Sequence, residues 1–272
     1  MAYLYPVFLL LFFSVYAGEM KSKTLYKPPA PELTITKVDP TPEPNNASVE
    51  ISYPEQGDVV ENPVSFNFRI RGFSLGTRSS FPRSEEIADH GEGQSVHIMI
   101  DDEPYAVFTG PSMDPFDEDG DYYQQNYQIE LPKHLSNGMH VVRMVLARSY
   151  GESLKSSDSF AMSSFFVGEK KGKSKLSYPI LTYNEPSAEY SYAYNTPILL
   201  DFLVTDGILS KTSYGVKVEI DGKKIDTLYE KSPYYIYGLK KGRHKIRLSL
   251  VNRQSRELGG FLQESVHLIR VQ

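Results

Sequence analysis

The stretch MDPFDEDGDYYQQ, residues 113–125, places five carboxylates within eight positions. A calcium-binding loop of the helix-loop-helix type needs acids at its first, third and fifth positions, glycine at its sixth and glutamate at its twelfth. When Gly120 takes the sixth position, the third and fifth are acidic, but the first is Pro115 and the twelfth is Asn126. The spacing therefore fails at two ligands, and we predict no metal site of this type.

Five like charges so close together need water or a cation around them. Water is sufficient at a loop tip between two strands, and an Asp-Gly pair by itself favours a turn. A charged tip also keeps a sheet edge from pairing with other chains. We therefore expect the acidic loop 114–121 to be solvated, with a weak Ca²⁺ site of dissociation constant on the order of 10⁻³ M as the alternative. Its acids are Asp114, Asp117, Glu118, Asp119 and Asp121.

The histidines do not have the spacing of a zinc site, and the chain has no cysteine. His97 alternates with Val96 and Ile98, so we expect it to face solvent. His140 and His244 occupy equivalent positions in an internal repeat and are in phase with apolar residues, which predicts packed, hydrogen-bonded structural histidines. Nucleophile elbows, phosphate loops and dinucleotide fingerprints are also missing. We predict no catalytic residues, no cofactor, no metal and no enzymatic activity.

Tyrosine offers a different kind of chemistry, because its ring gives a large contact area with a polar tip. In EYSYAYN, residues 189–195, Tyr190, Tyr192 and Tyr194 would share one face of an extended strand. They form a candidate ligand surface. The alternative interpretation is that this face packs against a neighbouring sheet or domain.

Length and composition limit the elements that could position these groups. A chain of 272 residues can hold two domains. Its net charge of −5 gives no reason to expect a nucleic acid partner. Charge is uneven, since residues 96–130 contain nine acids without Lys or Arg and residues 240–256 contain seven Lys or Arg without an acid. The absence of cysteine excludes a disulfide framework, so each domain must be stabilised by its own hydrophobic core.

The first residues predict export. Residues 2–17 are uncharged and mostly apolar, which is shorter than a membrane-spanning helix requires. Val15 and Ala17 are small residues where a signal peptidase reads, so we expect a signal peptide over 1–17 and a mature chain starting at Gly18. An uncleaved N-terminal anchor is the alternative and would be the only membrane attachment. Six prolines in 18–47 predict a disordered, semi-rigid spacer.

A repeated strand pattern fills the rest of the chain. NPVSFNFRI at 62–70 aligns with TPILLDFLV at 196–204, and VHIMID at 96–101 aligns with VKVEID at 216–221. GMHVVRMVLA likewise aligns with GRHKIRLSLV, and SYP occurs near the start of each copy. Alternating apolar residues predict one core-facing set in each first strand. These are Val64, Phe66, Phe68 and Ile70 in the first copy and Ile198, Leu200, Phe202 and Val204 in the second.

Short alternating strands bounded by Gly, Pro, Asp and Asn are typical of antiparallel β-sandwiches. We predict an all-β protein with two tandem immunoglobulin-like sandwiches, the first at 48–168 and the second at 176–272, joined by a charged linker at 169–175. Each is expected to fold independently.

The motif V-x-I-x-I-D followed by G-x-H-x-x-R-x-x-L resembles tandem immunoglobulin-like and fibronectin-III-like modules of bacterial envelope and secreted proteins. The resemblance implies an architecture and no activity. Asp221-Gly222 matches the turn of those modules, whereas Asp101-Asp102 departs from it. We expect a non-enzymatic binding or spacer module, periplasmic or extracellular, with a protein or glycan partner in the envelope. The alternative is a carbohydrate-binding or enzyme-accessory protein that uses the tyrosine face.

Overall fold

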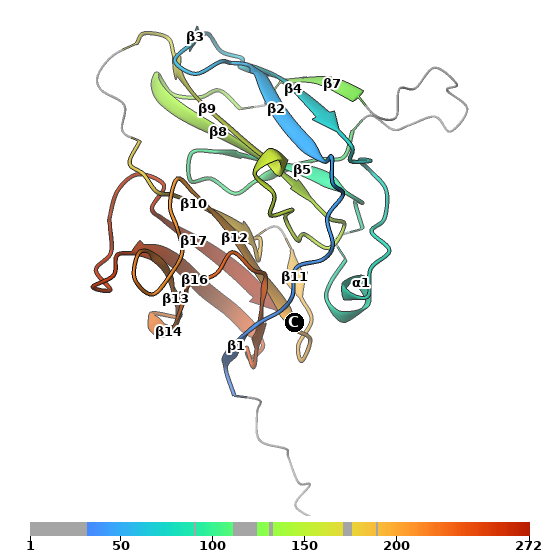
Figure 1. Cartoon of the computed structure of the whole chain (residues 1–272), viewed down its shortest axis with the longest axis vertical. Helices are drawn as coiled ribbons and strands as arrows, with labels where there is room; N and C mark the ends of the chain where they lie inside the picture. Colours follow the sequence, from blue (N-terminus) through green and yellow to red (C-terminus); the bar gives the residue numbers. More distant parts are fainter. Residues whose placement is uncertain (1–31, 90, 111–123, 131–132, 171–175, 189) are drawn as a thin grey trace, which may run out of the picture. The chain divides into compact units, whose positions relative to one another are not determined.

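The computed structural model describes residues 32–89, 91–110, 124–130, 133–170, 176–188 and 190–272. The strands form two β-sandwiches, each made of two sheets, which confirms the predicted fold class (Figure 1). Among these residues, helical structure is confined to α1 (Arg83–Glu86) and to a short 3-10 turn, η1 (Ser157–Ser159). Residues 31–272 make up one compact unit.

The first sandwich pairs a three-stranded sheet with a five-stranded sheet. The three-stranded sheet has the order β2 (Ser48–Tyr53), β4 (Ser65–Arg71), β7 (Gln124–Glu130). The five-stranded sheet has the order β3 (Val59–Val60), β9 (Phe160–Val167), β8 (Gly138–Ala147), β5 (Ser95–Ile100), β6 (Ala106–Phe108). Strand β3 is parallel to β9 and the other pairs are antiparallel. The division of strands between the sheets is that of an immunoglobulin-like domain.

The second sandwich repeats this arrangement with one addition. One sheet has the order β1 (Thr34–Lys37), β15 (Tyr234–Tyr237), β12 (Ile198–Thr205), β10 (Ile180–Glu185). The other has the order β11 (Ser191–Tyr192), β17 (Glu264–Val271), β16 (Gly242–Val251), β13 (Gly215–Ile220), β14 (Lys223–Leu228). Strand β11 is parallel to β17, as β3 is to β9. The internal repeat is therefore a repeat of topology.

Each sandwich has its own core, built as the alternation predicted. All four core-facing residues predicted for the first copy lie in one buried cluster, where the rings of Phe66 and Phe165 meet edge to face at 5.7 Å. All four predicted for the second copy lie in the other cluster, which also contains Leu248 and Ile269. Burying one apolar side chain of this size contributes roughly 1.5–3 kcal/mol.

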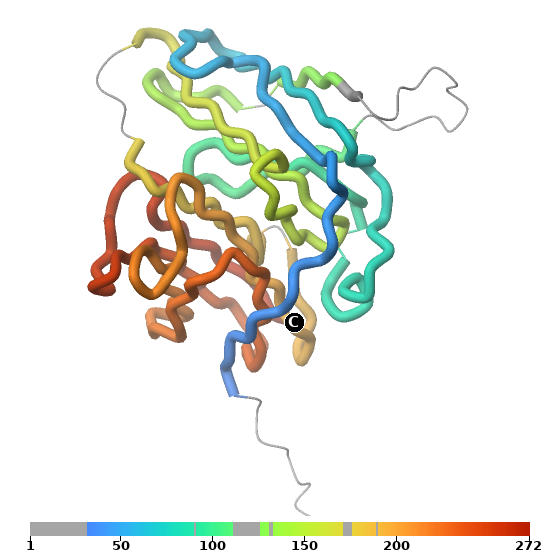
Figure 2. The backbone as a smooth tube through the Cα atoms, viewed as in Figure 1, coloured from blue at the N-terminus to red at the C-terminus, as the bar shows by residue number. Residues whose placement is uncertain are grey.

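The segment expected to be a disordered spacer is ordered over its described residues, so that prediction is wrong there. Residues 34–37 form β1, which pairs antiparallel with β15 of the second sandwich in register Thr34↔Tyr237 to Lys37↔Tyr234 (Figure 2). The following residues bind the first sandwich, where Thr41 N–H and Glu152 Oε1 lie 2.9 Å apart. An open sheet edge offers unpaired backbone groups, and β15 uses them to hold this segment.

The two sandwiches meet face to face. In β8, both faces of the strand are buried over nearly its whole length, whereas the first four residues of the equivalent β16 are exposed or half-buried. The outer face of β5 and β8 packs on the outer face of β10 and β12, with Met99 and Val145 against Leu203, and Val141 against Ile180. This face of the first sandwich is therefore a domain joint, not a surface.

Candidate functional site

The acidic loop 114–121 and the apolar segment 1–17 lie outside the described residues. The described ranges contain no group of three or more His, Cys, Asp or Glu side chains that could hold a metal ion. Within the same ranges, no helix is long and apolar enough to cross a membrane.

The repeated histidines have the structural role predicted for them. His140 Nδ1 lies 2.8 Å from Asp101 Oδ2 and its Nε2 lies 2.8 Å from Ser136 O. Both ring nitrogens face oxygen acceptors, so the doubly protonated ring satisfies both, and the hydrogen bond with Asp101 raises the pKa of His140. In the second copy His244 makes the same pair of contacts, with Asp221 Oδ2 at 2.8 Å and Lys240 O at 2.7 Å.

These Asp–His pairs explain the motif that runs through both copies. Asp101 and Asp221 both have φ of 52°, the left-handed turn conformation that aspartate tolerates better than most residues. The second oxygen of each carboxylate accepts the backbone N–H of the residue after the histidine, at 2.9 Å in both copies. The first aspartate of the turn thus ties it to the neighbouring strand, and the departure at Asp102 leaves this geometry unchanged.

His97 does not face solvent, and the prediction for it was wrong. The side chain is buried between the sandwiches, where its Nδ1 donates to Asn184 Oδ1 at 2.6 Å and its ring stacks on Tyr105 at 3.9 Å. The alternation placed it correctly on the outer face of its strand. That face is covered by the second sandwich, which the pattern of one strand does not reveal.

The joint between the sandwiches contains a buried polar network. Asp201 Oδ2 accepts from Ser153 Oγ at 2.5 Å and from Asn184 Nδ2 at 2.9 Å, while Lys155 pairs with its other oxygen. Arg143 donates from Nη1 to the backbone oxygen of Leu181 at 2.9 Å. Burial lowers the pKa of Arg143 to about 10. These groups come from both sandwiches, so their hydrogen bonds fix one sandwich on the other.

Glu185 is the most strongly perturbed carboxyl of this joint. It accepts from the hydroxyls of Tyr105 and Tyr192, the latter at 2.9 Å, and from the N–H of Ser187 at 2.8 Å. Burial raises the pKa of Glu185 to about 8 in spite of these donors. Perturbed carboxyls often mark catalytic sites, but Glu185 and Asp201 are 1% and 0% exposed. A substrate cannot reach either group, so both are structural.

The polar loop 71–95 is also part of the joint. Its helix α1 carries Arg83, which pairs with the buried Glu152 and donates from Nε to Tyr235 Oη at 3.1 Å. Ile87 of the same loop packs with Tyr150, Leu199 and Tyr235. Residues before and after α1 line a cavity of about 370 Å³, where Arg78 and Asp89 pair at 3.0 Å. The loop between β4 and β5 is longer than the equivalent loop between β12 and β13, and it reaches the second sandwich.

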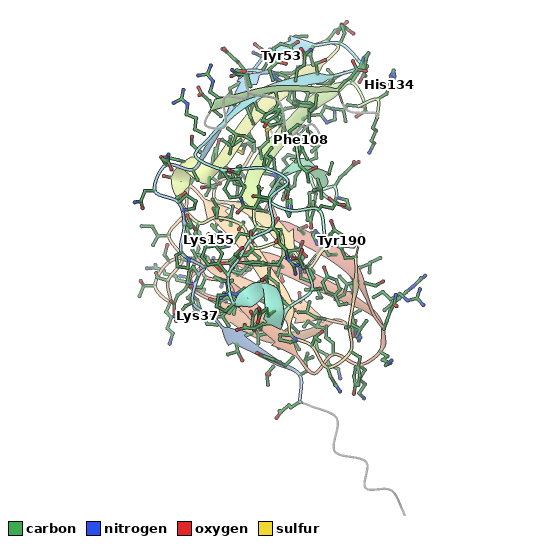
Figure 3. All side chains as sticks on the ribbon, turned by 90° about the vertical axis from the view of Figure 1, so that its right-hand side faces the viewer. Lys37, Tyr53, Phe108, His134, Lys155 and Tyr190 are labelled. Carbon is green, nitrogen blue, oxygen red and sulfur yellow. The ribbon has the colours of Figure 1, made fainter. Side chains whose placement is uncertain are left out.

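The three candidate tyrosines lie in different surroundings. Tyr192 is 4% exposed, belongs to the second core and bonds to Glu185, so it is not part of a ligand surface. Tyr194 is half-buried, and Lys241 Nζ lies 5.7 Å above its ring. Tyr190 is half-buried at the junction of the two sandwiches, where Figure 3 labels it, and it lines a pocket. Of the three predicted rings, only Tyr190 therefore lines a pocket that could hold a ligand.

The pocket beside Tyr190 has a volume of about 350 Å³. We call it the Tyr190 pocket. Its lining consists of Ala188, Tyr190, Ser191, Arg243, Leu268, Ile269 and Arg270. It lies where β11 pairs with β17, beside the first residues of β16 and the last residues of β17. A pocket of this size is at the lower end of the range for small-molecule sites.

The pocket opens on the outer face of the second sandwich. Arg243 and Arg270 stand directly opposite each other in the register of β16 and β17, and Lys245 stands opposite Leu268. Leu268 is 64% exposed and Val266, two positions before it in β17, is 39% exposed, so apolar surface lies beside these cations. Within the part of the chain that the structure describes, none of the three cations forms an ion pair. We call Arg243, Lys245, Leu268 and Arg270 the Arg-Leu face.

The other end of the same sheet face has balanced charges. Lys217 lies 3.1 Å from Glu219, and Arg247 pairs with Glu219, with Glu264 and with Glu257 at 2.6 Å. Hydrogen bonds from Arg247 lower the pKa of Glu257 to about 2. The sheet face is therefore divided into a closed ion network and an open cationic region next to the Tyr190 pocket. The basic run 240–256 contributes to both regions, and the charge pattern of the sequence does not distinguish them.

No family model matches the chain, and comparison with curated proteins gives no match. Among solved structures, it is similar to the fibronectin(III)-like modules of CbhA from Clostridium thermocellum, at 15% identity over 82% of this chain and 94% of that one, with a TM-score of 0.27. Latent PorU from Porphyromonas gingivalis is also similar at 15% identity, over 84% of this chain and 20% of that one, with a TM-score of 0.26.

The mixed-linkage glucan utilization protein SGBP-B from Bacteroides ovatus, solved with a heptasaccharide, is similar at 11% identity over 83% of this chain and 47% of that one, with a TM-score of 0.19. The chain thus spans less than half of the two longer proteins. At such low TM-scores the fold assignment rests on the strand orders described above, which define a tandem of immunoglobulin-like sandwiches. This confirms the fold-level resemblance to immunoglobulin-like and fibronectin-III-like modules.

Proposed function

We propose that the protein is a non-enzymatic, exported binding module of the bacterial cell envelope. The second sandwich presents the binding surface, and the first sandwich with the N-terminal segment acts as a spacer that holds it. The observation that carries this proposal is the contrast between two equivalent sheet faces. The outer face of β5 and β8 is closed in the joint, whereas the Arg-Leu face of β16 and β17 is exposed.

The chemistry of the buried groups supports a binding role over a catalytic one. A general acid or base must come within hydrogen-bond reach of its substrate. The carboxyls of Glu185 and Asp201 are enclosed by partners from both sandwiches, and both serve to hold the joint. The Arg-Leu face combines an exposed apolar residue with three cations that form no ion pair among the described residues, which suits recognition of an anionic partner.

A second candidate function is a carbohydrate-binding or enzyme-accessory role. The observation that favours it is the position of Tyr190 in a pocket. Since Tyr192 belongs to the core, such a role would depend on the Tyr190 pocket and not on a platform of three rings.

Binding to isolated bacterial envelopes tests the proposal. Purified protein is sedimented with an envelope preparation, and Leu268→Glu is compared with Ile208→Glu. Ile208 is 75% exposed on a loop of the same sandwich, so both variants place the same charge on an exposed apolar position. We expect Leu268→Glu to lower the bound fraction about tenfold or more, as for a central interface residue, with Ile208→Glu unchanged. Equal binding by the two variants, or no binding by the wild type, would contradict the proposal.

Export is tested separately by N-terminal sequencing of the protein purified from its native host. A chain that starts at Gly18 would show a cleaved signal peptide. A retained Met1 in the membrane fraction would instead show an anchor, which keeps the module in the envelope by another route.

A further inference from the structure

Arg243 and Arg270 form a cross-strand pair of like charges, which destabilises the fold. Like charges directly opposite each other in an antiparallel pair are destabilising. In the neighbouring half of the sheet face, each cation has a carboxylate partner within 3.1 Å. An anion between Arg243 and Arg270 would remove the repulsion, and two guanidinium groups are well suited to a carboxylate, which they bind through paired N–H donors.

The other residues that line the pocket indicate the chemistry of the rest of the ligand. Tyr190 and Leu268 offer apolar surface, and the exposed Ser191 offers a hydroxyl that can donate or accept. The ligand should therefore have an apolar face, hydroxyl groups at its rim and one carboxylate. A pyranose ring with a carboxylate substituent has all three features.

We propose that the Tyr190 pocket binds a sugar acid unit of an acidic glycan, with the carboxylate between Arg243 and Arg270. The sugar ring lies against Tyr190 and Leu268, and Ser191 bonds a ring hydroxyl. Lys245, next to this pair along β16, adds long-range attraction for further acidic units of the same glycan. This inference rests on the proposed function, since it names the partner of the Arg-Leu face.

The size of this solvent-open pocket favours a single sugar unit over an acidic protein surface. Protein partners usually bury about 800 Å² on each side of a fairly flat interface. The Tyr190 pocket is concave, has a volume of about 350 Å³ and is lined by both polar and apolar side chains. Small ligands with a few directed polar contacts bind in such sites.

Calorimetric titration of the full chain with tetragalacturonate tests the inference. We expect saturable binding that weakens about tenfold or more in Arg243→Gln and in Arg270→Gln, because each change removes a charge-assisted, paired hydrogen bond. Arg253→Gln is the matched control, since it removes the same charge from an exposed position in the loop between β16 and β17, at the opposite end of these strands, and it should leave the affinity unchanged. Tyr190→Leu keeps an apolar side chain at the joint and should weaken binding through loss of the ring.

Two comparison ligands complete the experiment. Maltotetraose, which is neutral, and an oligoglutamate peptide, which carries carboxylates without sugar rings, should give no saturable heat. Equal binding of either one, no binding of tetragalacturonate, or tetragalacturonate binding that Arg243→Gln and Arg270→Gln leave intact would overturn the inference. If tetragalacturonate fails while Leu268→Glu still abolishes envelope binding, the proposed function stands and the sugar acid assignment falls. If envelope binding fails as well, both are wrong.

Discussion

Replacing Glu185 with glutamine should remove much of the pH dependence of stability between pH 4.5 and about 8. The carboxyl is buried in the joint between the sandwiches, where burial raises its pKa from 4.5 to about 8. Glutamine is uncharged and of similar size. Its oxygen can accept from Tyr192 and Ser187, and its NH₂ can donate to Tyr105, because a tyrosine hydroxyl both donates and accepts.

The sign follows from proton linkage. A carboxyl with a raised pKa in the folded state binds its proton more tightly there than in the unfolded chain. Its contribution to stability is fully present below pH 4.5 and is lost as pH rises through about 8. At 1.36 kcal/mol per pKa unit, a rise from 4.5 to about 8 sets a ceiling of about 5 kcal/mol. Water entering the joint on ionisation lowers this figure, and we expect a loss of about 3 kcal/mol.

Urea unfolding at pH 4.5 and above pH 8 measures the effect for the wild type and Glu185→Gln. The wild type should lose about 3 kcal/mol more than the variant over this interval. Glu50→Gln, an exposed substitution on β2, is the control and should behave as the wild type. Equal pH dependence of the wild type and Glu185→Gln would refute the reasoning, because it would mean that the carboxyl is ionised in the folded protein with little penalty.

Three further predictions concern the joint, the N-terminal segment and the repeated histidine. Arg83→Met should lower the free energy of unfolding by about 3 kcal/mol in urea titrations, because it leaves the buried Glu152 without its cation. Ile35→Asp should release β1 from the edge of β15, because its side chain packs on the second core; amide exchange along β15 should then accelerate about tenfold or more, and unchanged rates would refute this. The NMR titration of His140 should give a pKa above 6.5, so its contribution to stability is full below pH 6.5 and is lost as pH rises through the folded value, whereas Asp101→Asn should return the pKa towards 6.5.

The cores and the repeat could be predicted from the sequence because their causes are local. Alternation along each strand decides which side chains are buried, as it does for Phe66 and Phe202. The repeated spacing between Asp101 and His140, and between Asp221 and His244, likewise reflects one hydrogen-bonded pair that occurs twice.

The joint and the strand β1 could not be predicted in this way because their causes lie far apart in the chain. Strand β1 finds its partner about two hundred positions further on, at the edge of β15. His97 has the alternation of a solvent-facing residue and is nevertheless covered by β10. The alternation of β12 likewise puts Asp201 on the outer face of its strand, where Ser153 of the other sandwich donates to it.

The sequence nevertheless contains a signal for the joint, which becomes visible when the two copies are aligned by their strand registers. Three outer-face positions of the first copy are apolar where those of the second are charged or polar. The pairs are Met99 with Glu219, Val141 with Lys245 and Val145 with Ser249, from β5 and β8 against β13 and β16. Two copies of one fold have similar demands for a core, so a difference at outer-face positions indicates that these faces have different surroundings.

This difference between the copies also constrains what the exposed face can do. The first copy uses its apolar outer face to hold a sandwich, and the second could not do the same, because Lys217, Glu219 and Arg247 would be buried at a cost of several kcal/mol per ion. Their mutual pairing satisfies them in water instead. The cations beside the Tyr190 pocket have no carboxylate partner in the described part of the chain, and neither of these roles explains them. A small anionic ligand is the partner that this part of the face can accept without burying the neighbouring ion network.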